Sequence, residues 1–160
     1  MTRKKEVGLK KKKRIVQNII APKIPQQILL DNIHFIAENQ EKVKKLIYNE
    51  QYQARFFLFE KNYYPTIHFI RENPSIDFPS VQVDQGAVSH VLNGADIFAQ
   101  GITSVDREFD TNSIVIVTNP QNAVISLGKS LKSSKDLLNS KGKGLLNIHR
   151  LGDEIWNGNL

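Results

Sequence analysis

The sequence predicts an α+β fold, with a small α/β domain over residues 1–78 and a mixed β pseudo-barrel with short helices over residues 79–160. Three observations support this prediction. Short runs of β-branched and aromatic residues alternate with turn residues, which is typical of small barrels. Residues 81–103 read as a strand, a helix and a strand joined by glycines. Prolines punctuate residues 73–79, where we place the domain boundary.

The stretch from 81 to 103 organises the second domain. Val81 and Val83 alternate with a polar residue, as in a half-buried strand. The apolar residues of 87–92 fall on one stripe of a two-turn helix, and Gly94 ends that helix. Residues 95–99 alternate again as a strand, and the glycine that follows at 101 fits a turn or a close backbone approach.

The same stretch resembles the signature of the PUA domain, an RNA-binding module named for pseudouridine synthases and archaeosine transglycosylases. That signature runs roughly V-D-x-G-A, a hydrophobic residue, two variable residues, V-L-x-G-A-[DN] and a second hydrophobic residue. The matching positions are Asp84, Gly86, Ala87, Val91, Leu92, Gly94, Ala95, Asp96 and Gly101. The resemblance implies a PUA-type pseudo-barrel for residues 79–160.

A second resemblance lies upstream of the signature. Residues 63–67 read YYPTI and are similar to the F-Y-P-T-L segment before the PUA domain of the malignant-T-cell-amplified-sequence proteins and their archaeal relatives. Those proteins are associated with translation. With Pro74 and residues 142–156, the resemblance extends over residues 63–156 and implies a pre-PUA domain followed by a PUA domain.

The net charge of +6 is concentrated at the start of the chain. Eight of the 22 basic residues precede Ile15, and Glu6 is the only acidic residue there. The other 14 basic and 15 acidic residues nearly balance. We therefore predict a basic arm over residues 1–14, which either contacts nucleic-acid phosphates or only keeps the chain in solution.

The rest of the first domain gives weaker signals. Apolar residues over 15–20 have helical spacing, and Pro22 ends that helix or strand. Residues 26–37 fit either a helix or a strand, and we favour a helix. Residues 42–48 and 54–60 read as the two strands of a hairpin.

Six aromatic residues crowd between positions 56 and 69. Such side chains can stack on unpaired bases. Because aliphatic residues surround them, core packing is the better interpretation.

The remaining elements of the second domain follow from local composition. They are a loop over 104–112, a buried strand over 113–118, a strand over 123–127 that pairs back, a helix over 129–139 capped by Ser133 or Ser134, and a last strand over 145–151.

Nothing in the sequence favours catalysis. Residues 123–130 fit the loose form of a phosphate-binding loop, but Val124, Ile125 and Leu127 fill it with strand formers. The four histidines are scattered, and cysteine is absent. We expect a non-enzyme without a metal or cofactor.

The resemblance places the RNA face on the helix after Gly86, the strand after Gly94 and the final strand. The helix N-terminus would present backbone amides to a phosphate, and small residues would let the sugar-phosphate chain come close. Several lysines would add a basic rim. The candidate RNA-binding residues are Gly86, Ala87, Ser89, His90, Gly94, Ala95, Gly101, Lys129, Lys141, Lys143, His149 and Arg150.

We expect the partner to be structured RNA, such as tRNA or rRNA, bound in translation or on the ribosome. One alternative is an adaptor that binds a translation-factor protein, and another is an accessory module of an RNA-modification system. No apolar run approaches the ~20 residues of a membrane span, and no signal-type core follows the basic start. We therefore expect a cytoplasmic protein.

Overall fold

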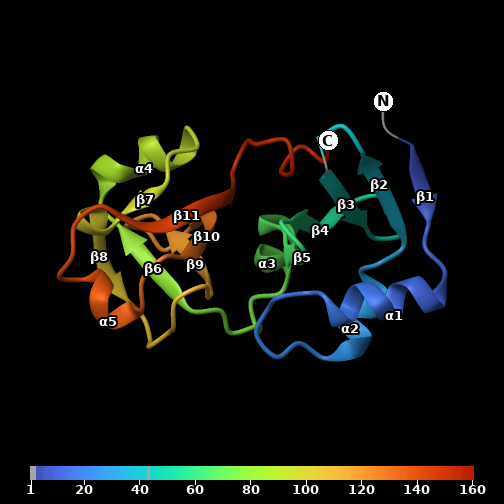
Figure 1. The fold of residues 1–160 in the computed structure, drawn as a ribbon, viewed down its shortest axis with the longest axis horizontal. Coiled ribbons are helices and arrows are strands. Elements are labelled where there is room, and N and C mark those ends of the chain that lie inside the picture. Colours follow the sequence, from blue (N-terminus) through green and yellow to red (C-terminus); the bar gives the residue numbers. More distant parts are fainter. Residues whose placement is uncertain (1–2, 43) are drawn as a thin grey trace. The chain divides into compact units, whose positions relative to one another are not determined.

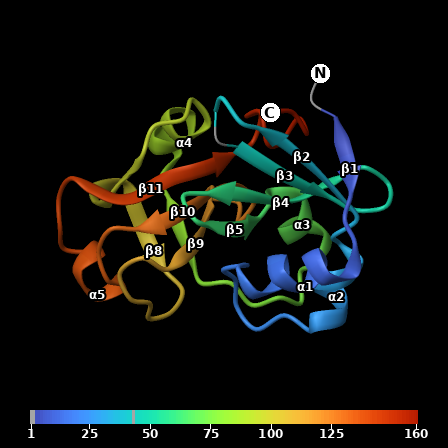
Figure 2. The ribbon, with the colours of Figure 1, turned by 45° about the vertical axis from the view of Figure 1, so that its right-hand side comes forward.

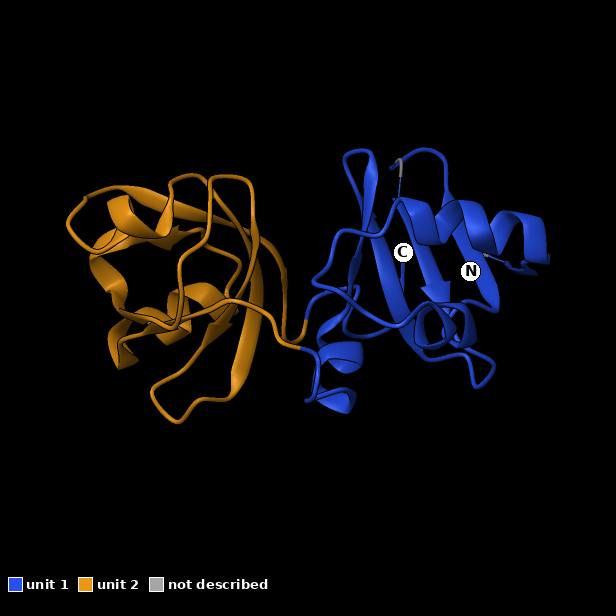
Figure 3. Ribbon diagram, turned by 90° about the horizontal axis from the view of Figure 1, so that it is seen from below, with its two compact units in different colours: residues 1–76, 153–160 blue, residues 77–152 orange. Residues whose placement is uncertain are grey.

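The structure is a computed structural model that describes residues 3–42 and 44–160 (Figures 1 and 2). It divides into two compact units: unit 1, residues 1–76 with 153–160, and unit 2, residues 77–152 (Figure 3). Residues 153–160, which we expected in the second domain, thus pack with unit 1.

Unit 1 is built on an antiparallel sheet. Within the described residues it has five strands in the order β1-β2-β3-β4-β5, so each strand pairs with its neighbour in the sequence. The strands are β1 (Lys4–Glu6), β2 (Phe35–Asn39), β3 (Lys44–Tyr48), β4 (Ala54–Phe59) and β5 (Asn62–Pro65).

Three helices complete unit 1. Helices α1 (Leu9–Gln17) and α2 (Gln26–Asp31) lie next to each other, and α3 (Ile67–Glu72) packs beside β4 (Figures 1 and 2). Buried side chains from helices, strands and loops meet in one cluster: Val7, Ile15, Leu29, Ile33, Ile36, Ile47, Phe56, Tyr63 and Phe69. This cluster holds the helices on the sheet.

Within residues 3–14, the described part of the predicted basic arm, the chain forms a strand and most of a helix, which corrects the prediction of a terminal arm; residues 1 and 2 lie outside the described residues. β1 pairs with β2, with Lys5 opposite Ile36, and α1 carries four consecutive lysines. Two features conceal this fold in the sequence. A three-residue strand of sequence KKE has no apolar alternation, and α1 buries only Ile15 fully.

The other predictions for unit 1 are partly right. The hairpin over 42–48 and 54–60 is confirmed by β3 and β4. The helix favoured over 26–37 is right only as far as Asp31, because β2 begins at Phe35. Sequence analysis missed β5 and α3, although Thr66 caps α3 by accepting a hydrogen bond from the Phe69 amide at 3.2 Å.

The aromatic residues of this region pack in the core, as predicted. Phe56 and Phe69 are fully buried, with ring centroids 5.0 Å apart, and Phe57 is 2% exposed. These three rings are therefore closed to any base.

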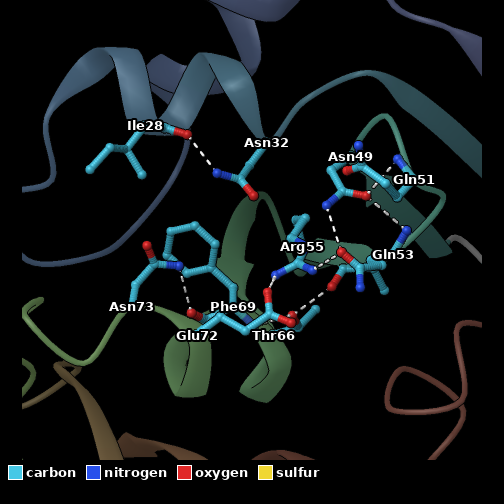
Figure 4. Close-up of polar contacts among 11 residues, drawn as sticks. Ile28, Asn32, Asn49, Gln51, Gln53, Arg55, Thr66, Phe69, Glu72 and Asn73 are labelled. Atoms are coloured by element: carbon cyan, nitrogen blue, oxygen red, sulfur yellow. Dashed lines mark hydrogen bonds and ion pairs between the residues drawn. The ribbon is translucent and has the colours of Figure 1, made fainter.

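A buried arginine connects β4 to α3. Arg55 is 2% exposed, and its guanidinium forms an ion pair with Glu72 and donates to the Gln53 side chain (Figure 4). Asn49 orders the adjoining turn, because its side-chain oxygen accepts from the Gln51 and Gln53 amides at 3.1 and 3.0 Å. The network ties the β3–β4 turn to α3.

The C-terminal segment is fastened to unit 1 by side chains. Trp156 stacks on His68 with ring centroids 3.7 Å apart. The Glu154 carboxylate lies 3.0 Å from Lys44 Nζ and 3.7 Å from Lys42 Nζ. The hydrogen bond from Lys44, with the charges of both lysines, holds the pKa of Glu154 below its ordinary value. Because Trp156 is the only tryptophan, its fluorescence reports on unit 1.

Unit 2 is a mixed sheet with short helices, which confirms the predicted fold class. In the described part of the chain it has six strands in the order β7-β11-β10-β9-β6-β8, and only β6 and β9 run parallel. The elements are β6 (Ser80–Val83), α4 (Gln85–Leu92), β7 (Ile97–Phe98), the 3-10 turn η1 (Ala99–Gly101), β8 (Ile102–Val105), β9 (Ile114–Thr118), β10 (Val124–Ser130), α5 (Ser134–Leu137) and β11 (Lys143–Arg150).

The strand, helix and strand predicted over 81–103 are confirmed by β6, α4 and β7, although β7 is short and passes into η1. The helix predicted over 129–139 is confined to α5, because Lys129 still belongs to β10 and pairs with Ile114 and Leu146. Among the described residues, no helix is long and apolar enough to cross a membrane.

Candidate nucleic-acid interface

Helix α4 begins at a side-chain cap. Asp84, the residue before the helix, accepts a hydrogen bond from the Ala87 backbone amide at 2.8 Å. An aspartate at this position is a strong helix start signal. The Asp84 carboxylate thereby takes the Ala87 amide, which we expected to donate to a phosphate, and it adds a negative charge at the N-terminus of the helix. The N-terminus of α4 therefore offers less to a phosphate than we expected.

Helix α4 ends in a glycine turn. Gly94 has φ +93°, and its amide donates to the Val91 carbonyl at 3.0 Å. The Ala95 amide donates to the His90 carbonyl, also at 3.0 Å. These two bonds form a Schellman motif. The motif favours glycine at the residue with positive φ, because a Cβ there would clash with the backbone. The turn sends the chain from α4 toward β7.

Small residues let α4 approach η1. A Cβ at Gly101 would lie 3.3 Å from the Cβ of Ala87, which is a tight contact. The Gly101 carbonyl also accepts from the Asp84 amide at 2.9 Å. The signature residues Gly101 and Ala87 thus set the distance between the helix and the turn.

These elements form a pocket of about 390 Å³. Its volume lies within the roughly 300–1,000 Å³ of typical ligand pockets. Phe98 lines it and is 44% exposed, although it is a large apolar side chain. The lining residues are Gly86, Ala87, His90, Val91, Ala95, Asp96, Ile97, Phe98, Gln100 and Gly101. Most of the walls are small or apolar, with polar groups at His90, Asp96 and Gln100.

Asn147 of β11 fixes the pocket to the sheet. Its side-chain amide donates to the carbonyls of Val91 and Ala95 at 3.0 and 2.9 Å. Its backbone amide donates to Asp96 Oδ1 at 2.9 Å, and its side-chain oxygen accepts from the Ser126 hydroxyl at 2.9 Å. Sequence analysis missed this residue. The available signal was an amide side chain inside a predicted strand, where asparagine is unfavourable.

Two cations lie near the pocket. Lys143 Nζ is 3.1 Å from Asp96 Oδ2, so part of its charge is compensated within the site. The Arg150 guanidinium lies against Gly94, because a Cβ at Gly94 would be 3.1 Å from Arg150 Nε. The site therefore combines an apolar hollow with positive charge at its edge.

The structure sorts the predicted RNA-binding residues into three groups. Those that line the pocket are Gly86, Ala87, His90, Ala95 and Gly101. Those that lie beside it are Gly94, Lys143 and Arg150. Those outside its lining are Ser89 and Lys141, which are exposed, and Lys129, which is half-buried in β10.

His149 does not belong to the interface. Its side chain is 1% exposed, and it pairs in register with the buried Leu127 of β10. Neighbouring residues of a strand point to opposite faces, so the half-buried Arg150 is reachable where His149 is not. We therefore remove His149 from the candidate RNA-binding residues.

In residues 3–42 and 44–160, no three His, Cys, Asp or Glu side chains are grouped to hold a metal ion. The groups that the described site does offer are its apolar walls, Phe98 and two neighbouring cations.

Comparison with known proteins finds a family match within unit 2. The PUA domain family matches residues 79–152. Translation machinery-associated protein 20 of Eremothecium gossypii is 37% identical over 117 residues, which are 68% of this chain and 64% of that protein. The chain thus spans less than two thirds of this relative. The malignant T-cell-amplified sequence 1 homolog of Dictyostelium discoideum is 29% identical over 154 residues, 91% of this chain and 78% of that protein.

Solved structures show the same fold. A PUA domain crystal structure from Aeropyrum pernix K1 has a TM-score of 0.81 at 18% identity and covers 98% of this chain and 90% of that chain. A conserved PUA domain protein from Thermoplasma acidophilum has a TM-score of 0.71 at 23% identity and covers 97% and 98%. Residues 79–152 thus match the PUA domain family, and the chain as a whole is similar to the malignant-T-cell-amplified-sequence and translation machinery-associated 20 proteins.

Proposed function

We propose that this protein binds structured RNA, such as tRNA or rRNA, during translation, and that an unpaired nucleotide of that RNA enters the pocket between α4 and β7. The observation that carries the proposal is the exposed ring of Phe98 on a pocket with apolar walls. An exposed aromatic beside small residues suits a base that stacks on it.

The surroundings of the pocket fit a sugar-phosphate chain. The Arg150 guanidinium beside Gly94 supplies charge for a phosphate, and the lack of a side chain at Gly86 leaves room for the backbone of the RNA. The names of the relatives, translation machinery-associated protein 20 among them, support a role in translation.

Two variants test the pocket. Phe98→Ala should weaken RNA binding roughly 5- to 150-fold, because stacking contributes about 1–3 kcal/mol per base. Gly86→Glu should weaken RNA binding further, because it places a carboxylate in the pocket. That change should leave the fold intact, since a Cβ at Gly86 meets only Asp84 Oδ1 at 3.4 Å and glutamate suits a helix N-terminus.

The measurement is fluorescence anisotropy with total tRNA and with rRNA fragments, after circular dichroism has shown that each variant is folded. Gly86→Gln separates the bulk of the new side chain from its charge. Leu131→Ala removes a comparable exposed apolar side chain outside the pocket lining and should bind as the wild type does. If Phe98→Ala and Gly86→Glu both bind normally, RNA does not enter this pocket. If the wild type binds neither RNA, an adaptor of a translation-factor protein becomes the better function.

A further inference from the structure

The two units differ sharply in charge. Unit 2 carries 7 basic and 7 acidic residues, whereas unit 1 carries 15 basic and 9 acidic residues. The whole net charge of +6 therefore belongs to unit 1. Affinity for a polyanion that does not depend on sequence rises with the number of phosphates a surface neutralises. On charge alone, unit 1 is therefore the better surface for such affinity.

Helix α1 concentrates that charge on one side. Lys10, Lys13 and Arg14 are spaced by three and four residues, which puts them on the same helix face. All three are exposed, whereas Ile15 is buried in the core of unit 1. Helix α1 thus packs on unit 1 through Ile15 and exposes Lys10, Lys13 and Arg14 to solvent.

The charge pattern of α1 opposes helix formation. Its first turn contains lysines and no acidic residue, which is unfavourable at the positive end of the helix dipole. Like charges three and four residues apart also repel each other. Lys11 has an acidic partner, because its Nζ lies 3.8 Å from Glu38 Oε1. For Lys10, Lys13 and Arg14, the part of the chain that the structure describes shows no carboxylate within 4.0 Å.

A sequence that keeps a locally unfavourable pattern commonly does so at a functional site. We propose that the face of α1 formed by Lys10, Lys13 and Arg14 binds the phosphate backbone of RNA and supplies much of the salt-dependent affinity of the protein. The inference rests on the proposed function for the choice of polyanion. A lipid surface fits less well, because Leu9 is the one large apolar residue of α1 that is well exposed, and membrane-surface helices need a broad apolar face.

The test replaces the three cations by neutral residues of similar size. In Lys10→Gln/Lys13→Gln/Arg14→Gln, the slope of log affinity against log salt should fall by about 2–3, because each lost phosphate contact removes about 0.7–0.9. The melting temperature should not fall, because repulsion within α1 is relieved. If the triple variant is poorly folded, the double variant Lys10→Gln/Lys13→Gln should lower the slope by about 1.5.

A matched control removes the same charge elsewhere. Lys23, Lys61 and Lys135 are exposed, and Lys23→Gln/Lys61→Gln/Lys135→Gln should keep nearly the wild-type slope. The inference is overturned if the α1 triple variant also keeps the wild-type slope, in which case the face serves another partner, such as an acidic protein. Gly86→Glu distinguishes the two proposals. It should lower the affinity for the RNA ligand. The α1 variant should instead reduce the slope of log affinity against log salt, and it should do so with any RNA. Either proposal can therefore fail while the other holds.

Discussion

The variant Asn147→Asp should lower the free energy of unfolding of unit 2 by about 3 kcal/mol, because it removes two hydrogen bonds and leaves their acceptors facing a carboxylate. In the native protein the Asn147 amide donates to the Val91 and Ala95 carbonyls. An aspartate of the same shape turns both contacts into repulsion between oxygens, and the Asp96 carboxylate lies close by. The end of α4 and the start of β7 should therefore detach from β11.

This variant should also lose RNA binding, because Val91, Ala95 and Asp96 line the pocket. Urea unfolding followed by far-UV circular dichroism measures the stability, and anisotropy measures the binding. Asn93→Asp is the matched control. It makes the same chemical change at an exposed position at the end of the same helix, and it should cost well under 1 kcal/mol. Equal effects of the two changes would show that added charge, rather than the lost hydrogen bonds, is responsible.

The variant Glu72→Gln should destabilise unit 1 by about 2–3 kcal/mol, because it leaves the buried Arg55 guanidinium without a counter-charge. Arg55 is 2% exposed, and Glu72 is half exposed, so water reduces the cost below that of a fully buried pair. The Gln53 side chain remains as a neutral acceptor for the arginine. The variant therefore removes the negative charge beside Arg55 but keeps the hydrogen bond to Gln53.

Removing the arginine as well should restore much of the lost stability. Arg55→Met/Glu72→Gln should be more stable than Glu72→Gln alone, because no unpaired charge is then buried. Trp156 fluorescence during urea unfolding is the measurement, since this residue lies in unit 1. Glu50→Gln changes an exposed carboxylate of the same unit and should leave the transition in place. A double variant less stable than Glu72→Gln would mean that packing of the arginine stem matters more than its charge.

The parts of the fold that the sequence predicted are those with strong local signals. The apolar stripe of α4 and the glycine at 94 each act within a few residues, so the helix of the second domain was predictable. The hairpin of β3 and β4 was predictable for the same reason, because aromatic and β-branched residues mark both strands.

The missed parts depend on distant partners. β1 has no apolar pattern of its own and exists because its backbone pairs with β2, some thirty residues away in the sequence. The C-terminal segment packs on unit 1 because Trp156 stacks on His68, and no local sequence pattern predicts that contact. The pocket shows both cases. Its glycines and alanines were predicted from the signature, whereas Asn147 was not, because its four hydrogen bonds reach α4, the segment after it and β10.

The most direct test of the account is to locate the bound RNA on the protein. Uniformly ¹⁵N-labelled protein would be titrated with a short RNA hairpin that carries an unpaired 3′ overhang, and amide chemical shifts would be followed residue by residue. We predict that the largest shifts fall on residues 85–101 and Arg150, with a second set on α1 that disappears as salt is raised. Saturating binding with shifts confined to other surfaces would contradict the account, because the pocket between α4 and β7 would then take no part in RNA recognition.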